Sequence, residues 1–345
     1  MGSLALYAQV LRRMRPYLGR LCVAVIGVIL ASSAEVLKPW PLKLVIDTVL
    51  GGAPMRNRLL ASMPRGELLA WACAALVVIY ALLGIVSVMN NYLTISIGQA
   101  MVNELRARLF DHLQRLSMSF HRRREIGDLM VRIAYDTFSV QTIAMNGFFP
   151  VFASLVLLGG MFAVMVRMDA ELTMVALAVV PLLFILIMSI SGRIDRLASA
   201  SREKESWMYT VAHRALSAIG VVQAFTREAS SYREFVGASA QSLGENLRLY
   251  IFQTLYSGGV NVMIAAGTAG VIYLGARHVQ GGRLTIGDLI VFTAYLAALY
   301  APINQIFQTY GLVQSAKAGL RRCLELLAID PEIKDRPDAR TLGRV

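Results

Sequence analysis

The sequence of 345 residues is 56% hydrophobic and only 16% charged, and its mean hydropathy is +0.57. Soluble domains carry about 25% charged residues, so this composition excludes an ordinary soluble protein and predicts an all-α protein that crosses a membrane several times. The net charge of +12 could suggest nucleic acid as a partner, but the placement of the basic residues, described below, argues against it.

Cysteine and histidine usage predicts neither a disulfide framework nor a metal site. The three cysteines fall in different predicted regions, and the four histidines show no spacing typical of metal ligands. We therefore expect no catalytic residue, no metal and no cofactor in this chain.

The N-terminal segment 4–14 predicts a short amphipathic helix on the inner leaflet, with apolar residues facing one way and arginines the other. The first predicted membrane span covers residues 18–49. It is the least apolar of the spans, since it contains two prolines and four charged residues: Glu35, Lys38, Pro39, Pro41, Lys43 and Asp47.

The second span begins near Leu68, and residues 68–103 contain no Asp, Glu, Lys or Arg. A helix of that length would reach roughly 54 Å, more than the ~30 Å that a bilayer core requires. Leucines spaced by three or four residues then continue the helical pattern to Leu116. The second helix is therefore predicted to continue past the membrane into the cytoplasm.

A polar, basic stretch follows at 118–136 and contains Arg122, Arg123 and Arg124. The third span lies within 137–166, and a short external turn leads to the fourth at 172–192. The segment 193–248 predicts two helical extensions joined near Gly220. The fifth span lies in 249–276 and the sixth in 289–316, around Pro302.

The basic residues are distributed unequally between the two sides of this arrangement. Six of the 34 Lys and Arg fall in the predicted external segments and two in the first span, and all the others fall on the opposite side. This positive-inside distribution predicts that both termini are cytoplasmic.

Five short motifs, taken in order, carry a resemblance to a known family. The two most specific lie in the predicted cytoplasmic hairpins: Phe120 with Gly127-Asp128-Leu129, Arg132 and Asp136, and Gly220 through Phe225 with Glu228. The others are Pro39-Trp40-Pro41-Leu42 with Asp47, Gly287-Asp288-Leu289, and Pro302. With this topology the chain resembles the transmembrane domain of an ABC exporter, the six-helix half of a type I (type IV fold) transporter.

The resemblance implies a domain plan and a partner. Residues 1–17 would form an elbow helix, 18–325 the six-helix domain with cytoplasmic hairpins at about 104–136 and 193–248, and 326–345 the start of a linker to an ATPase domain. A second transmembrane half would complete a homodimer or heterodimer. Two short coupling helices would contact the ATPase domain through Phe120, His121, Arg122, Gly127, Asp128, Arg132, Gly220, Gln223, Phe225 and Glu228.

The sequence departs from the family pattern in lacking the nucleotide-binding motifs. It contains no G-x-x-x-x-G-K-[ST] phosphate loop and no Leu-Ser-Gly-Gly signature. The resemblance implies that ATP and Mg bind to a separate ATPase domain. That domain either continues the chain beyond the linker, which we favour, or is another polypeptide.

Several alternatives remain open at this level. Arg122 to Arg124 could contact lipid headgroups instead of an ATPase domain, and Phe120 and Phe225 could be ordinary packing residues. Asp128 and Asp136 are expected to cap helices or pair with nearby arginines. Glu35 and Lys38, spaced i, i+3, are predicted to pair and either to line the cargo path or to fix helix packing.

The function predicted from these features is the cargo-translocating half of an ATP-driven exporter in the inner membrane of a bacterium. The alternative is a stand-alone channel or secondary carrier without an ATPase partner. Cargo is not readable from the sequence, and lipid, drug, peptide and glycan all remain open.

Overall fold

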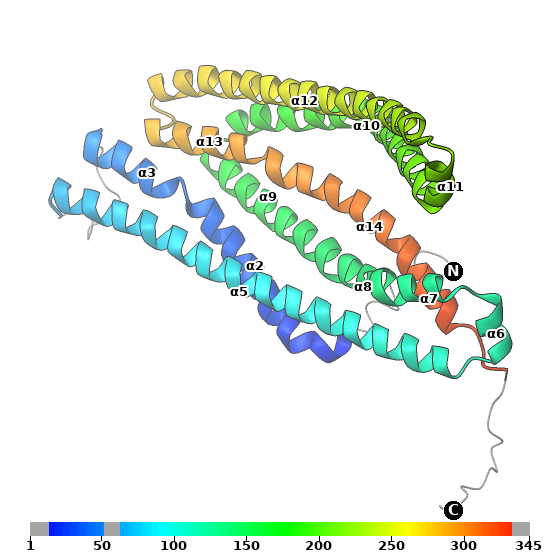
Figure 1. Cartoon of the computed structure of the whole chain (residues 1–345). Coiled ribbons are helices and arrows are strands. Elements are labelled where there is room, and N and C mark those ends of the chain that lie inside the picture. Colours follow the sequence, from blue (N-terminus) through cyan, green and yellow to red (C-terminus); the bar gives the residue numbers. More distant parts are fainter. Residues whose placement is uncertain (1–13, 52–62, 333–345) are drawn as a thin grey trace, which may run out of the picture. The chain divides into compact units, whose positions relative to one another are not determined.

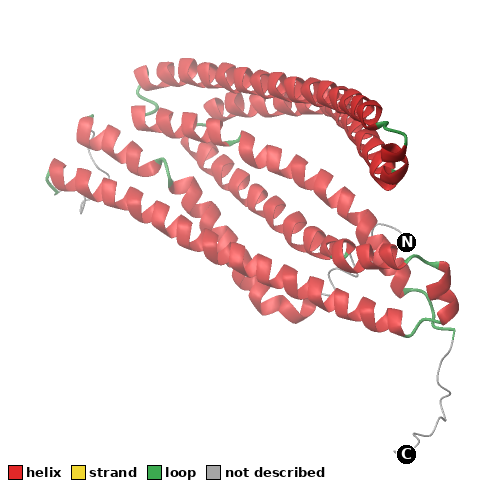
Figure 2. Ribbon diagram, viewed as in Figure 1, coloured by secondary structure: helices red, strands yellow, loops and turns green. Residues whose placement is uncertain are grey.

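The computed structural model describes residues 14–51 and 63–332, and the predicted N-terminal amphipathic helix lies almost wholly outside them. The regular structure in these residues is helical (Figures 1 and 2). Within these described residues, six helical segments are long and apolar enough to cross a membrane. The predicted all-α fold with six membrane-spanning helices is confirmed.

The chain divides into two compact units. Unit 1 comprises residues 1–168 and 285–345, and thus holds the first three spans and the sixth. Unit 2 comprises residues 169–284 and holds the fourth and fifth spans.

The first span of unit 1 is a broken helix. After the short turn η1 (Arg15–Tyr17), α2 runs over Leu18–Leu37, α3 over Trp40–Leu44, and the π-helical segment η2 over Val45–Leu50. The break falls at Lys38 and Pro39, because Pro39 and Pro41 lack the backbone N–H groups that would continue the α-helical ladder.

The second span, α5 (Arg65–Gln114), is one unbroken helix of 50 residues, about 75 Å long at 1.5 Å per residue. The predicted continuation of this helix beyond the length of a bilayer is therefore confirmed. Its buried side chains include Ile97, Met101, Leu105 and Leu109, spaced by four residues along one face.

The third span is segmented where α5 is continuous (Figure 1). It follows two short helices, α6 (Met118–Arg123) and α7 (Ile126–Val131). The π-helical segments η3 (Arg132–Asp136) and η4 (Thr142–Gly147) then flank α8 (Phe138–Gln141), and α9 (Phe148–Met168) completes the span.

The sixth span consists of α13 (Ile286–Ala298) and α14 (Tyr300–Leu327). The last turns of α14 pack against the far end of α5 in one hydrophobic cluster that includes Leu109, Leu113, Leu320 and Cys323. Gly319 permits the close approach of α14 to the third span, because a Cβ atom there would lie 2.3 Å from Ser139 Oγ.

Unit 2 is a long antiparallel pair of helices, α10 (Ala170–Ser217) and α12 (Glu228–Gln280). The short helix α11 (Ile219–Ala224) joins them, so the two extensions predicted to meet near Gly220 are confirmed. Along the pair, Ser201 Oγ donates to Asn246 Oδ1 at 2.7 Å, and Gly267 lies against Val179.

The start of α10 is held by Asp169, which lies between two spans. Its carboxylate accepts hydrogen bonds from the backbone N–H of Leu172 at 2.9 Å and from His278 Nδ1 at 2.8 Å. Burial alone would raise the pKa of Asp169, but the hydrogen bonds and the neighbouring imidazole outweigh it and lower the pKa below its usual value. The carboxylate therefore caps α10 and ties it to α12.

Candidate functional site

The first candidate coupling element is the corner formed by α6 and α7. Ser117 caps α6 by accepting a hydrogen bond from the backbone N–H of Phe120 at 3.4 Å. Phe120 packs partly against the hydrophobic core, and its ring meets that of His121 edge-on at 5.5 Å. His121 is anchored by a hydrogen bond between Nε2 and the carbonyl oxygen of Leu113 at 3.0 Å. The corner is thus fixed to the end of α5.

Charged side chains on this corner divide into paired and unpaired groups. Asp128 forms ion pairs with Arg132 at 3.1 Å and with Arg124 at 3.7 Å, as expected for a structural partner of nearby arginines. Arg122 is exposed and forms no ion pair with any other described residue. Gly127 is also exposed. Residues 120–132 therefore lie together on unit 1, and Arg122 is exposed on their surface.

A second set of contacts ties this corner to α14. Asp136 is almost fully buried and accepts two hydrogen bonds from Arg322, at 2.7 Å from Nε and 2.5 Å from Nη2. Arg106 of α5 donates to the carbonyl oxygens of Ile133 and Ala134 at 3.2 and 2.8 Å. The sequence predicted an arginine partner for Asp136, but it did not identify Arg322, which is 186 positions away.

The second candidate coupling element is α11 with its flanking turn in unit 2. Gly220, Gln223, Phe225 and Glu228 are all exposed, and 72% of the Phe225 surface is accessible. Thr226, directly after Phe225, has a positive φ of 49°, which marks a tight turn before α12. Phe225 is therefore not a packing residue of unit 2, whereas Phe120 is partly one of unit 1.

The charged residues of the first span lie at the end of α2, on α3 and on η2, and α3 lies at the opposite end of unit 1 from α6 (Figure 1). Lys38 and Glu35 form the predicted ion pair at 2.5 Å, and the Lys38 ammonium also lies 5.0 Å from the centre of the Tyr80 ring. Both side chains remain about one-third exposed.

Two motifs that are far apart in the sequence meet near this pair. Lys43 forms an ion pair with Asp288 at 2.5 Å, and Asp47 accepts hydrogen bonds from the hydroxyl of Thr285 at 2.6 Å and from the backbone N–H of Gly287 at 2.8 Å. Thr285 and Asp288 also form a capping box at the start of α13. The sequence pointed to each motif separately and did not predict that they bind each other.

Comparison with known proteins identifies what this arrangement is similar to. Residues 21–303 match the family model of the ABC transporter transmembrane region. The chain is 29% identical over 243 residues to the uncharacterized ABC transporter ATP-binding protein YknV of Bacillus subtilis (strain 168), an alignment covering 70% of this chain and 40% of YknV.

Two further relatives are both named ATP-dependent lipid A-core flippase. That of Syntrophus aciditrophicus (strain SB) is 26% identical over 341 residues, covering 99% of this chain and 55% of the relative. That of Methylococcus capsulatus (strain ATCC 33009 / NCIMB 11132 / Bath) is 25% identical over 344 residues, covering 100% of this chain and 54% of the relative. The chain thus spans about half the length of the curated relatives it matches.

The family match covers most of the chain. Of the six apolar helices, four lie wholly within the matched residues, and the first and the sixth extend beyond its ends. The protein is therefore an integral membrane protein that belongs to the ABC transporter transmembrane region family.

Proposed function

We propose that this chain is the membrane-spanning, cargo-translocating half of an ATP-driven exporter that works as a dimer. The observation that carries the proposal is the exposed α11 corner, where Phe225 projects from the end of two long helices. An apolar side chain at such a place is suited to insert into a partner protein. The names of the relatives, which include ATP-binding and ATP-dependent proteins, support an ATPase as that partner.

In this proposal ATP and Mg bind to ATPase domains, in the same polypeptide or in another, and this chain supplies no catalytic residue. Association of two ATPase domains around ATP would move α6, α7 and α11, and the long helices would carry that movement to the membrane. The cargo path would then open alternately to the two sides. The positive-inside distribution supports placing both coupling corners and both termini in the cytoplasm of a bacterial cell.

The role of Phe225 is tested by Phe225→Ala in the full-length transporter with its ATPase domain. Tyr232→Ala is the matched control, because Tyr232 is 69% exposed and lies about one turn into α12. We expect Phe225→Ala to leave the protein folded and ATP bound, and to reduce transport and cargo-stimulated ATP hydrolysis about five-fold or more, since the coupling free energy between the sites is lost. Equal activities in the two variants would contradict the proposal.

For the cargo path we propose that Glu35 and Lys38 line its outer part. The pair is one-third exposed in unit 1, which favours contact with a wet cavity over full burial between helices. Exchanging the two charges (Glu35→Lys with Lys38→Glu) preserves the pair. A residue pair that only fixes packing would survive the exchange with the same cargo selectivity, whereas we expect the exchanged protein to move a different set of cargoes in a competition assay.

A further inference from the structure

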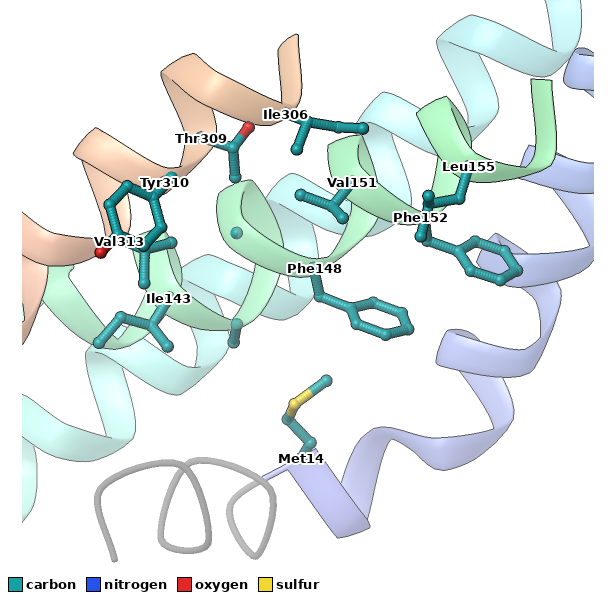
Figure 3. Close-up of a pocket in the computed structure, with 12 residues that line it drawn as sticks. Met14, Ile143, Phe148, Val151, Phe152, Leu155, Ile306, Thr309, Tyr310 and Val313 are labelled. Atoms are coloured by element: carbon teal, nitrogen blue, oxygen red, sulfur yellow. The ribbon is translucent and has the colours of Figure 1, made fainter. Parts of the chain in front are cut away.

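Unit 1 contains an open apolar cavity of about 710 Å³, which is lined by η4, α9 and α14 and by Met14 (Figure 3). One wall is formed by Phe148, Val151 and Phe152, and the facing wall by Ile306 and Val313 of α14. Met14, which immediately precedes η1, closes one end. The volume lies within the range of roughly 300–1,000 Å³ that is usual for sites holding small molecules.

The lining offers a ligand few side-chain polar groups, the hydroxyls of Thr309 and Tyr310. The rings of Phe148 and Phe152 stack at 5.7 Å with an interplanar angle of 7°, and in Figure 3 the Phe148 ring lies nearer to Met14 than the Phe152 ring does. The Thr309 hydroxyl is buried and already accepts a hydrogen bond from Gln305 at 3.2 Å. Ordered water would find no set of partners here, so an apolar occupant is favoured.

The end of the cavity at Met14 carries positive charge. Arg15 follows Met14 directly and is exposed, and Arg20 is exposed at the start of α2. Neither forms an ion pair within the described residues 14–51 and 63–332. A phosphate group near Met14 would be attracted by the exposed Arg15 guanidinium.

An apolar slot that ends beside the exposed Arg15, on the side predicted to be cytoplasmic, matches one class of molecule. We propose that the cavity binds an acyl chain of an anionic phospholipid of the inner leaflet, with the lipid phosphate at Arg15. The methylene groups of an acyl chain need no hydrogen-bond partner, so apolar walls leave no polar atom unpaired. Burial of these methylene groups is favourable. The site contains neither Glu35 nor Lys38, the two residues proposed to line the outer part of the cargo path.

The proposal is tested with the chain as it stands, reconstituted in nanodiscs of phosphatidylcholine. A phosphatidylglycerol carrying a diazirine on one acyl chain is added in trace amount, activated by light, and the labelled peptides are mapped by mass spectrometry. We expect saturable labelling of 143–155 and 306–313, which unlabelled phosphatidylglycerol displaces about five-fold better than phosphatidylcholine. Equal displacement by both lipids would mean non-selective bilayer contact and would overturn the proposal.

Two pairs of variants test the acyl-chain site and the headgroup site separately. Val151→Trp fills the cavity and is expected to abolish labelling of 306–313, whereas Val166→Trp, the same change on the same helix away from the cavity, is expected to leave it unchanged. Arg15→Gln is expected to reduce the preference for phosphatidylglycerol, while Arg65→Gln at the start of α5 is not. Labelling that persists in Val151→Trp would overturn the site.

The same measurement on cross-linked dimers distinguishes lipid from protein as the occupant. Retained labelling in the dimer supports a lipid site, and its loss would show instead that a second copy covers the cavity. Thermal melting of each variant confirms that the fold is intact, and the labelling of the unmodified protein tests the proposal even if a variant fails to fold.

Discussion

At the scale of single residues, the most informative contact is the one between Asp136 and Arg322. The carboxylate is buried between α14 and the third span, whereas about half of the guanidinium surface is exposed. Burial makes an unpaired carboxylate costly, so the two hydrogen bonds stabilise the contact more than an ordinary surface ion pair would. Among the described residues, the neighbouring Arg321 pairs only with Glu325, on the surface of the same helix.

Arg322→Gln is therefore expected to destabilise the protein by about 2 kcal/mol, because it leaves the Asp136 carboxylate without its charged donor. Arg321→Gln, one position away, is expected to cost less than about 0.5 kcal/mol. The measurement is the melting temperature of both single variants in the same detergent, together with that of the double variant Asp136→Asn/Arg322→Gln. If Arg322→Gln and Arg321→Gln melt at the same temperature, the Asp136–Arg322 ion pair does not stabilise unit 1.

At the scale of helices, the contact between α14 and the third span depends on Gly319. Its absent side chain leaves room for Ser139 and for the Asp136 carboxylate, which would lie 2.3 and 3.1 Å from a Cβ atom. Gly311 lies on the same helix with nothing within 4 Å of a Cβ atom. The two glycines thus differ in packing while sharing one helix.

Gly319→Ala is expected to cost about 1–3 kcal/mol, since the added methyl group forces Ser139 or α14 to move. Gly311→Ala is expected to be neutral or to stabilise by up to about 1 kcal/mol through its higher helix propensity. Thermal unfolding followed by circular dichroism measures both. A Gly319→Ala protein as stable as the Gly311→Ala protein would show that the helices are not closely packed at this point.

The helices differ in how far they could be predicted from the sequence. The length of α5 followed from an uncharged stretch and from leucines at helical spacing, because both signals are local. The π-helical segments η3 and η4 have no such local signal; they accompany long-range contacts, such as those of Arg106 with the carbonyl groups of η3. Contacts between distant positions, such as the ion pair of Lys43 with Asp288, could not be predicted either, because no sequence periodicity relates the two partners.

For the candidate coupling residues too, the position along the chain could be predicted from the sequence, whereas the burial of the side chain could not. The motifs placed Phe120 and Phe225 at helical corners, and the structure has α6 and α11 there. Their different exposure could not be predicted, because it depends on whether another element folds over each corner. The core packs against Phe120, and no described part of unit 2 buries Phe225.

At the scale of the whole molecule, the orientation in the membrane remains a prediction from charge. In a protein with Cys22, Cys73 and Cys323 replaced by serine, single cysteines are placed at Arg65 and Arg283, predicted to be external, and at Arg122 and Thr226, predicted to be cytoplasmic. We expect a membrane-impermeant maleimide to label only the first two in intact cells, and all four after lysis. Labelling at Arg122→Cys in intact cells would reverse the orientation and with it the proposed coupling side.

The contrast between the unbroken α5 and the segmented third span has a mechanical consequence. A rigid rod of about 75 Å acts as a lever arm, so a tilt of about 5° at one end displaces the other end by about 6 Å. The neighbouring span is expected to be less rigid, because η3 and η4 interrupt its regular α-helical hydrogen-bond ladder. Movement imposed on the α6–α7 corner would therefore reach the far end of unit 1 along α5, while the segmented span bends to follow it.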